Sequence, residues 1–304
     1  MKHMKFLSFF LGVTFSIVAC SSNNEIIPVP DVDPDGDDGT TEVEFAKGAD
    51  IGWVTEYESK GYNFYNAKGE QRECTALMKE LGLNAIRIRV WVDPSKHGNW
   101  CNTADVVEKA KRAKELGMDV MIDFHYSDWW ADPAQQNKPA SWVGKNLANL
   151  KSAIKDHTVS VLQALKTIGV IPKWVQVGNE IRPGMLWDED VALSGASYNV
   201  TEKDLKDAPA SATDKVVYPM NWANLGAFVT TGYDAVKSVF PDAIVIVHLD
   251  NGWDSGLFTW FELKKNGGKW DMIGMSLYPY WSRDAKEGYS SADAVITDCI
   301  SNIK

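Results

Sequence analysis

The feature that most constrains the fold of this chain is a repeated alternation between short apolar runs and longer segments with helical periodicity. A parallel strand is buried on both faces, so it reads as a short, continuous apolar run. The alternation therefore predicts an α/β fold whose strands wind in one direction. Six runs are predicted as strands: Phe45–Ile51, Asn84–Val90, Met118–Phe124, Trp174–Val177, Ala243–Leu249 and Met272–Leu277.

Helical segments separate these runs, and several of them end at a glycine, as helices often do. A closed barrel of this type has eight strands. We therefore predict a (β/α)8 barrel and expect its last two βα units to lie beyond Lys304. The polar stretch Ile181–Met220 is predicted as an excursion at the rim. The predicted helices are Gln71–Leu81, Thr103–Leu116, Asn146–Ile168, Asn221–Val239, Ser255–Lys265 and one that begins near Ser291.

The N-terminal region has the pattern of an exported lipoprotein. Residues 1–20 begin with a positive charge, continue as an apolar run and end at Cys20, which is expected to carry lipid. Cleavage at an ordinary secretory site is the alternative. Residues 21–44 are rich in Pro and Asp and are predicted to be a disordered linker. The folded domain is then 45–304, held at a membrane only by the lipid, at the cell surface or in the periplasm.

The charge and the remaining motifs exclude several classes of function. The net charge of -10 and the isoelectric point of about 5.0 argue against a nucleic-acid partner. No dinucleotide or phosphate loop is present. The histidines are scattered without the spacing of metal ligands, so no metal site is predicted, and His157 is expected to be an ordinary helix residue. Cys74 and Cys101 could pair or remain free, and Cys299 is expected to be unpaired.

The candidate chemistry lies where the apolar runs end. Glu180 and Asn179 follow Trp174–Val177 directly, and α/β barrels place their active sites at this end of the strands. Glu180 is therefore predicted to be catalytic, the alternative being a helix N-terminal acid. Polar and aromatic side chains also end the other runs: Arg87, Arg89 and Trp91; His125, Asp128, Trp129 and Trp130; His248 and Trp253; Ser276 and Tyr278. For Arg87 a structural ion pair and a site role remain equally open.

Tryptophan is unusually frequent, with 13 residues against 10 Tyr and 11 Phe. Many stand at predicted strand ends, where indoles can lie against the apolar faces of sugar rings. The repetition favours a carbohydrate-binding surface.

One stretch is more specific than the rest. Phe124–Pro133, followed by Gln136, Lys138–Pro139 and Trp142, resembles the arabinogalactan endo-β-1,4-galactanases of glycoside hydrolase family 53. Segments around Asp50, Arg87–Trp91, Val177–Glu180 and His248–Trp253 fit the same family. The likeness extends over nearly everything from Phe45 to Trp281.

The resemblance implies endo-cleavage of β-1,4-galactan with retention, in an eight-stranded barrel. It implies that Glu180 is the acid/base and that Asn179 contacts the sugar 2-hydroxyl. The remaining implied substrate-binding residues are Asp50, Arg89, His125, His248 and Tyr278 in the inner site, with Trp91, Asp128, Trp129 and Trp253 binding neighbouring sugars.

The resemblance also implies a nucleophilic Glu at the end of a seventh strand, which would lie beyond Lys304. The chain from Met1 to Lys304 is therefore expected to be inactive. No cofactor is expected, although calcium could bind late loops of the barrel beyond Lys304. We expect a monomer whose partner is the polysaccharide.

Two other functions remain open from the sequence. One is a related endo-hydrolase, such as a mannanase or cellulase, with a different main-chain sugar. The other is a surface glycan-binding protein that has lost catalysis.

Overall fold

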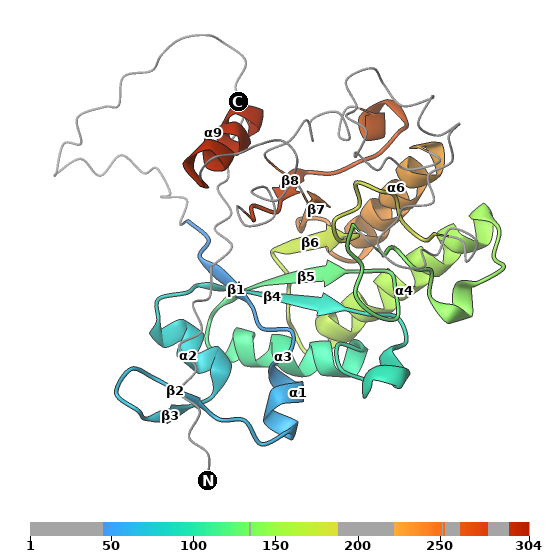
Figure 1. Cartoon of the computed structure of the whole chain (residues 1–304). Helices are drawn as coiled ribbons and strands as arrows, with labels where there is room; N and C mark the ends of the chain where they lie inside the picture. Colours follow the sequence, from blue (N-terminus) through green and yellow to red (C-terminus); the bar gives the residue numbers. More distant parts are fainter. Residues whose placement is uncertain are drawn as a thin grey trace.

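The computed structural model describes residues 45–133, 135–187, 222–250, 252, 262–278 and 292–303. The six predicted strands are present and pair in parallel in one sheet, in the order β1-β4-β5-β6-β7-β8. Strands that follow one another among these six are therefore neighbours in space. Figure 1 shows α3 and α4 lying along one side of β4 and β5. The strands are β1 Gly48–Asp50, β4 Ala85–Val90, β5 Asp119–Phe124, β6 Trp174–Val177, β7 Ile244–Leu249 and β8 Met272–Met275.

The predicted helices recur with small shifts at their ends. Asn102 and Asn146 start α3 and α4, because each side chain accepts a hydrogen bond from the backbone N–H three residues later. Residues 262–265 are helical, whereas 253–261 and 188–221 lie outside the described residues. The helices are α2 Cys74–Glu80, α3 Thr103–Glu115, α4 Leu147–Thr167, α6 Trp222–Val239 and α9 Ala292–Ile303.

The segment between β1 and β4 contains structure that the periodicity did not predict. A short helix, α1 Val54–Ser59, precedes an antiparallel hairpin of β2 Phe64–Tyr65 and β3 Gln71–Arg72. The helix predicted to begin at Gln71 therefore begins only at Cys74. The Glu73 side chain accepts from the N–H of Ala76 and caps the helix there, while Gln71 pairs with Tyr65 across the hairpin. Two 3-10 turns, η1 Pro94–His97 and η2 Ala140–Trp142, follow later strands.

The two faces of the sheet carry different cores. The outer face of β4 presents Ile86, Ile88 and Val90, all fully buried, toward the helices. The inner face forms a separate apolar cluster with one residue from each of four strands: Ala85, Met121, Trp174 and Ile246. This arrangement follows from the alternation of side chains along a strand, and it forms one layer of a barrel interior.

The next layer of inward-facing side chains along the strands, two residues after the apolar cluster, is polar. This corrects the expectation that β6 is apolar on both faces. Gln176, two residues after Trp174, is fully buried and points to the same inner side. Its neighbours in register are Asp123 on β5 and Ile246 on β7. Thus the inner face changes from apolar to polar within one pleat repeat.

The packing of α6 against β6 depends on a glycine. A Cβ at Gly232 would lie 2.5 Å from Val177 Cγ1 and 3.0 Å from the Tyr126 hydroxyl. Only a residue without a side chain allows this approach, which holds the strand that precedes Glu180.

The three cysteines that the structure describes are free thiols. Cys74, Cys101 and Cys299 are each buried and unpaired, so the second of the two alternatives for Cys74 and Cys101 holds and the expectation for Cys299 is confirmed. Cys101 instead donates to the carbonyl of Gly52, with Sγ and O 3.2 Å apart. Within the described part of the chain, no helix is long and apolar enough to cross a membrane.

Candidate active site

The polar layer inside the sheet is organised around Arg87. Its guanidinium lies 2.7 Å from an oxygen of Asp50 and 2.7 Å from an oxygen of Asp123. It also donates to the side-chain oxygens of Gln176, at 3.1 Å, and Asn179, at 2.9 Å. Arg87 therefore links β1, β5 and the end of β6, so the structural ion pair is present, while a role of Arg87 toward substrate stays a prediction.

Asp123 is the fully buried anion of this layer. It accepts from Gln176 Nε2 at 2.6 Å and faces His125 Nε2 at 2.9 Å, besides its ion pair with Arg87. Burial acts to raise the pKa of Asp123, but Arg87 and His125 hold it below the ordinary value. Asp123 is thus a permanent negative charge that orients its neighbours.

His125 is held in one orientation by a partner at each nitrogen. Its Nδ1 accepts from the backbone N–H of Ala131 at 2.9 Å, so its Nε2 carries the proton that points to Asp123. The ring is almost fully buried. In this structure His125 therefore connects the inner layer to the loop that follows β5.

Arg89 forms the link between the inner layer and the tryptophans. Its guanidinium lies 3.3 Å from Asp50 and 4.1 Å from the centroid of the Trp130 ring. Trp91 packs beside it, with Arg89 Cζ 5.3 Å from the ring centroid. A cation held over an indole fixes both groups, so Arg89 supports the aromatic surface from below.

The rim tryptophans form a stack in which only part is accessible. Trp91 is 2% exposed and lies 4.4 Å from Trp129, centroid to centroid, with His97 stacked on Trp129 at 3.8 Å. Trp130 is 36% exposed. Trp91 therefore supports the stack from within, Trp129 is half-buried between Trp91 and His97, and Trp130 is the exposed indole of the stack.

Asp128 has both carboxylate oxygens engaged by the protein. One accepts from the N–H of Asp93 at 2.9 Å and the other from the N–H of Ala140 at 2.8 Å. These contacts brace the loops after β4 and β5 against each other. Its predicted contact with a sugar remains a prediction.

A sharp turn after β6 positions Asn179. Gly178 has φ 80°, a left-handed conformation in which a Cβ would lie 2.5 Å from Ile181 Cγ2. Asn179 then donates to the carbonyl of Ala131 at 2.7 Å, while its oxygen accepts from Arg87. The amide is fixed at both ends and leaves the next residue at the mouth of the sheet.

Glu180 is the one titrating group of this turn. Its backbone has φ 52°, which is uncommon for a residue with a side chain and marks local strain. Burial raises the pKa of its carboxyl to about 7, with a further increase from Asp250 and an opposing hydrogen bond from Ser276. Ser276 Oγ lies 2.7 Å from Glu180 Oε1. Such a carboxyl can carry or release a proton near neutral pH.

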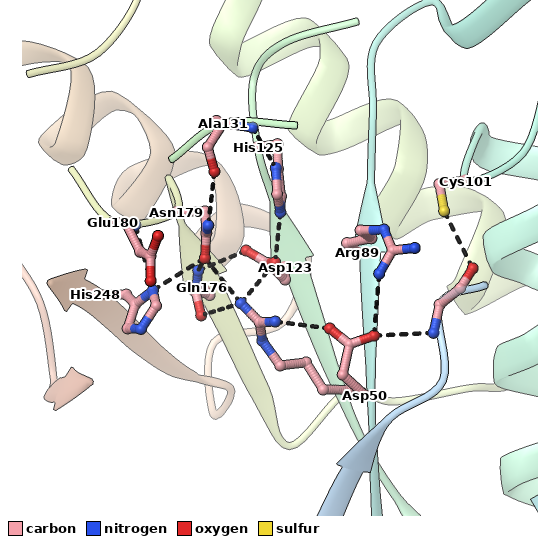
Figure 2. A network of polar contacts seen from close by, with 12 residues as sticks. Asp50, Arg89, Cys101, Asp123, His125, Ala131, Gln176, Asn179, Glu180 and His248 are labelled. Carbon is pink, nitrogen blue, oxygen red and sulfur yellow. Dashed lines mark hydrogen bonds and ion pairs between the residues drawn. The ribbon is translucent and has the colours of Figure 1, made fainter. Parts of the chain in front are cut away.

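His248, from the end of β7, lies between Asn179 and Ser276. Its Nδ1 is 3.0 Å from Asn179 Oδ1, and its Nε2 is 3.0 Å from Ser276 Oγ. Burial, together with the charge of Arg87, lowers its pKa to about 3. His248 is therefore neutral when Glu180 titrates. Figure 2 shows His248 and Glu180 on one side of Asn179 and Gln176, with Asp50 and Arg89 on the other.

The structure thus brings together most of the predicted site residues. Tyr278 is 41% exposed, and burial together with the charge of Glu180 raises the pKa of its phenol. Trp253 and Cys20 lie outside the described residues.

Asp123 and Gln176 were not among the predicted site residues, and Arg87 and Ser276 were named at strand ends without an assigned site role. Gln176 carried a signal, since it is a polar residue inside an apolar run. The only sequence signal for Ser276 was its position at the end of a predicted strand.

No described group of three or more His, Cys, Asp or Glu side chains could hold a metal ion. The absence of a cofactor remains a prediction, and so does the possibility of calcium in late loops of the barrel.

Comparisons of the sequence and of the structure with known proteins point to the same family. The model described as "Glycosyl hydrolase family 53" matches residues 46–299. The arabinogalactan endo-beta-1,4-galactanase of Thermothelomyces thermophilus is 34% identical over 247 residues, which are 79% of this chain and 65% of that protein. An uncharacterized protein in the bgaB 5' region of Niallia circulans is 37% identical over 79% of this chain and 60% of its own length.

A solved structure agrees with these sequences. The Ignisphaera aggregans GH53 catalytic domain has 30% sequence identity and a TM-score of 0.65, over 80% of this chain and 62% of that domain. The six-stranded sheet is accordingly the corresponding part of a (β/α)8 barrel, and the predicted fold class is confirmed. The chain spans less than two thirds of the length of each of these relatives.

Proposed function

The chain belongs to glycosyl hydrolase family 53, and we propose that it serves as an endo-β-1,4-galactanase on pectic (arabino)galactan, with Glu180 as acid/base. The relative from Thermothelomyces thermophilus is described as an arabinogalactan endo-beta-1,4-galactanase. The observation that carries the proposal is the environment of Glu180, whose pKa is raised to about 7 at the end of β6, beside the fixed amide of Asn179.

The proposed reaction is a double displacement. Protonated Glu180 gives its proton to the oxygen of the leaving sugar while a nucleophilic carboxylate bonds to the anomeric carbon. The deprotonated Glu180 then removes a proton from water, which attacks the glycosyl-enzyme with retention. In this reaction Asn179 holds the sugar 2-hydroxyl, and the exposed Trp130 and the half-buried Trp129 stack on neighbouring rings.

The nucleophile is a separate prediction. Retention requires a second carboxylate about 5–5.5 Å from the acid. Asp250, the nearest acidic residue after β7, forms a bidentate ion pair with Arg182 at 2.6 and 2.8 Å, which favours a structural role. We expect the nucleophile to follow a later strand, so a polypeptide of residues 1–304 alone should release no galacto-oligosaccharides. Measurable release by that polypeptide would contradict this expectation.

The acid/base role is tested in the protein as encoded. Glu180→Gln should lower turnover of galactan by about 10²–10⁴-fold, the usual contribution of general acid–base catalysis. The first step with an aryl galactoside that has a good leaving group should be affected much less, since that group departs without a proton. Glu108→Gln, on the exposed face of α3, is the matched control. Equal activity of Glu180→Gln and wild type on galactan would refute the role.

Substrate choice is tested by product release from galactan, mannan and cellulose under the same conditions. We expect release from galactan alone. Release from mannan or cellulose instead would support a related endo-hydrolase, and binding of galactan without any product would support a glycan-binding protein.

Export with a lipid anchor is also proposed, from the pattern of residues 1–20. Growth with a labelled fatty acid should place label on the protein, and Cys20→Ala should abolish the label. Labelling that persists in Cys20→Ala would exclude this residue as the anchor.

A further inference from the structure

We propose that Ser276 and His248 form a reversible hydrogen-bond relay that holds Glu180 in both of its protonation states, with His248 exchanging tautomer while remaining neutral. The proposal rests on the proposed acid/base role of Glu180 and names two positioning residues for it. The sequence names Ser276 at a strand end but assigns it no role.

The relay begins with a hydroxyl whose position is fixed. Ser276 is 5% exposed, and its backbone N–H donates to the carbonyl of Leu249 at 2.8 Å. Its carbonyl accepts from the N–H of Gly252 at 3.2 Å. The hydroxyl then lies 2.7 Å from Glu180 Oε1 and 3.0 Å from His248 Nε2. With a single hydrogen, it can donate to only one of these two groups at a time.

The protonated state of Glu180 sets one direction. The carboxyl O–H donates to Ser276 Oγ, and the Ser276 hydroxyl donates to His248 Nε2. His248 must then carry its proton on Nδ1, where it donates to Asn179 Oδ1 at 3.0 Å. Every hydrogen in this chain has an acceptor.

The ionised state requires the opposite direction. A carboxylate only accepts, so the Ser276 hydroxyl turns to Glu180 Oε1. If His248 kept the same tautomer, the lone pairs of Nε2 and Ser276 Oγ would face each other in a buried place, which is unfavourable. With the proton on Nε2, His248 donates to Ser276 instead. The ring holds one proton in both states, and the proton that leaves is that of Glu180.

The other nitrogen of His248 accommodates this exchange because it faces partners of both kinds. Asn179 Oδ1 can accept from Nδ1–H, and the backbone N–H of Glu180, 3.3 Å away, can donate to an unprotonated Nδ1. Asn179 Oδ1 does not depend on His248, because Arg87 and Gln176 donate to it at 2.9 and 3.1 Å. Each tautomer therefore has one complementary partner at Nδ1: Asn179 Oδ1 for the Nδ1–H form and the backbone N–H of Glu180 for the Nε2–H form.

His125 shows what a histidine without this freedom looks like. Its Nε2 faces only an acceptor, Asp123, and its Nδ1 faces only a donor, the N–H of Ala131. A single neutral tautomer satisfies both contacts. His125 is accordingly an internal control for His248.

Charged and titratable groups surround the relay on every side. They comprise Asp50 on β1, Arg87 on β4, Asp123 and His125 on β5, Asp132 after β5, Asp250 after β7 and Tyr278 after β8. Arg87 and Asp123 are paired with each other, and their opposing effects leave His248 neutral by burial. The titration that reverses the relay is therefore that of Glu180.

The test is a titration of 15N-labelled protein by long-range 1H–15N spectra, which report the tautomer of each imidazole, with 13C-labelled Glu to follow Glu180. Between pH 5 and pH 9, roughly two units to either side of pH 7, His248 should change from the Nδ1–H to the Nε2–H form. The midpoint of this exchange should coincide with that of Glu180, while His125 should show no exchange between its two neutral tautomers. A single His248 tautomer while Glu180 titrates would overturn the relay.

Variants separate the relay from a merely structural contact. Ser276→Ala should leave His248 in one tautomer and move the Glu180 midpoint to higher pH, because the hydroxyl stabilises the carboxylate. Ser276→Thr keeps a hydroxyl and should restore the exchange, and Glu180→Gln should abolish it. An exchange that persists in either Ser276→Ala or Glu180→Gln would overturn the relay.

The spectra and the activity assay fail independently. If Glu180→Gln is inactive but His248 never exchanges, the relay is wrong and the acid/base role stands. If His248 exchanges but Glu180→Gln keeps full activity on galactan, the relay stands and the proposed function of Glu180 is wrong.

Discussion

The two sides of the polar layer hold their side chains by different physical means. On the side of β1, β4 and β5, opposite charges meet, with Arg87 between Asp50 and Asp123. On the side of β6, β7 and β8, neutral groups lead to Glu180, with His248 beside Ser276. Figure 2 shows Asp50 and Arg89 apart from Glu180 and His248, with Asn179 and Gln176 between them.

The difference separates rigidity from titration. Paired ions in a buried place keep their charges over a wide pH range, because losing one leaves the other uncompensated. Neutral donors and acceptors can reverse direction at little electrostatic cost. The charged side therefore fixes the geometry, and the neutral side is where a proton can be gained or lost.

The largest effect is expected from breaking the charged side. Arg87→Ala leaves Asp123 buried without its cation, so the free energy of unfolding should fall by about 3–5 kcal/mol. Urea unfolding at neutral pH measures the change. Arg72→Ala is the control, since Arg72 also contacts two carboxylates, Glu70 and Glu80, but at the exposed surface, and little change is expected there. Equal effects of the two substitutions would remove the distinction between the sides.

A smaller effect with a defined sign is expected from Glu180→Gln. The folded pKa of about 7 lies above the ordinary value of 4.5, so wild-type stability is lost as pH rises between these values and is level above them. The variant lacks this loss. Its free energy of unfolding should exceed that of wild type by about 3 kcal/mol at pH 8, with no such gain at pH 4.

Glu73→Gln provides a control of opposite sign. Burial acts to raise the pKa of Glu73, but hydrogen bonds at the start of α2 bring it below the ordinary value. Its carboxylate therefore stabilises the protein above the unfolded pKa, and this contribution is lost as pH falls. Glu73→Gln should be less stable than wild type at pH 8, and the difference should shrink toward acid. A gain for Glu73→Gln, or none for Glu180→Gln, would contradict the assignment.

The smallest effect is expected from a charge near the neutral side. Asp250 raises the pKa of Glu180, so Asp250→Asn should move the alkaline limb of kcat/KM to lower pH in the protein as encoded. Asp242→Asn, at the opposite end of β7, should leave the limb in place. A shift of the same size in both variants would show that general charge, rather than position, sets this limb.

The sequence predicts the positions of the strands more accurately than the structure of the segments that connect them. The six strands follow from apolar runs, and Glu180 follows from its place after one of them. The periodicity predicts a helix from Gln71, but Gln71–Arg72 forms the second strand of a hairpin, because a strand of two residues has no period long enough to recognise. Arg89 was predicted for the site and Arg87 was left open, since two arginines on one strand face look alike until their partners are placed.

The sequence by itself determined the parallel architecture and put Glu180 at the end of a buried strand, where we propose that the chemistry lies. These depend on side-chain patterns within a few residues, which local backbone geometry sets. Only the tertiary structure decided that Ser276 meets Glu180, 96 positions away, and that Arg87 meets Asn179, 92 positions away. Such partners depend on strand register and on burial, and neither property is written in any single stretch of the chain.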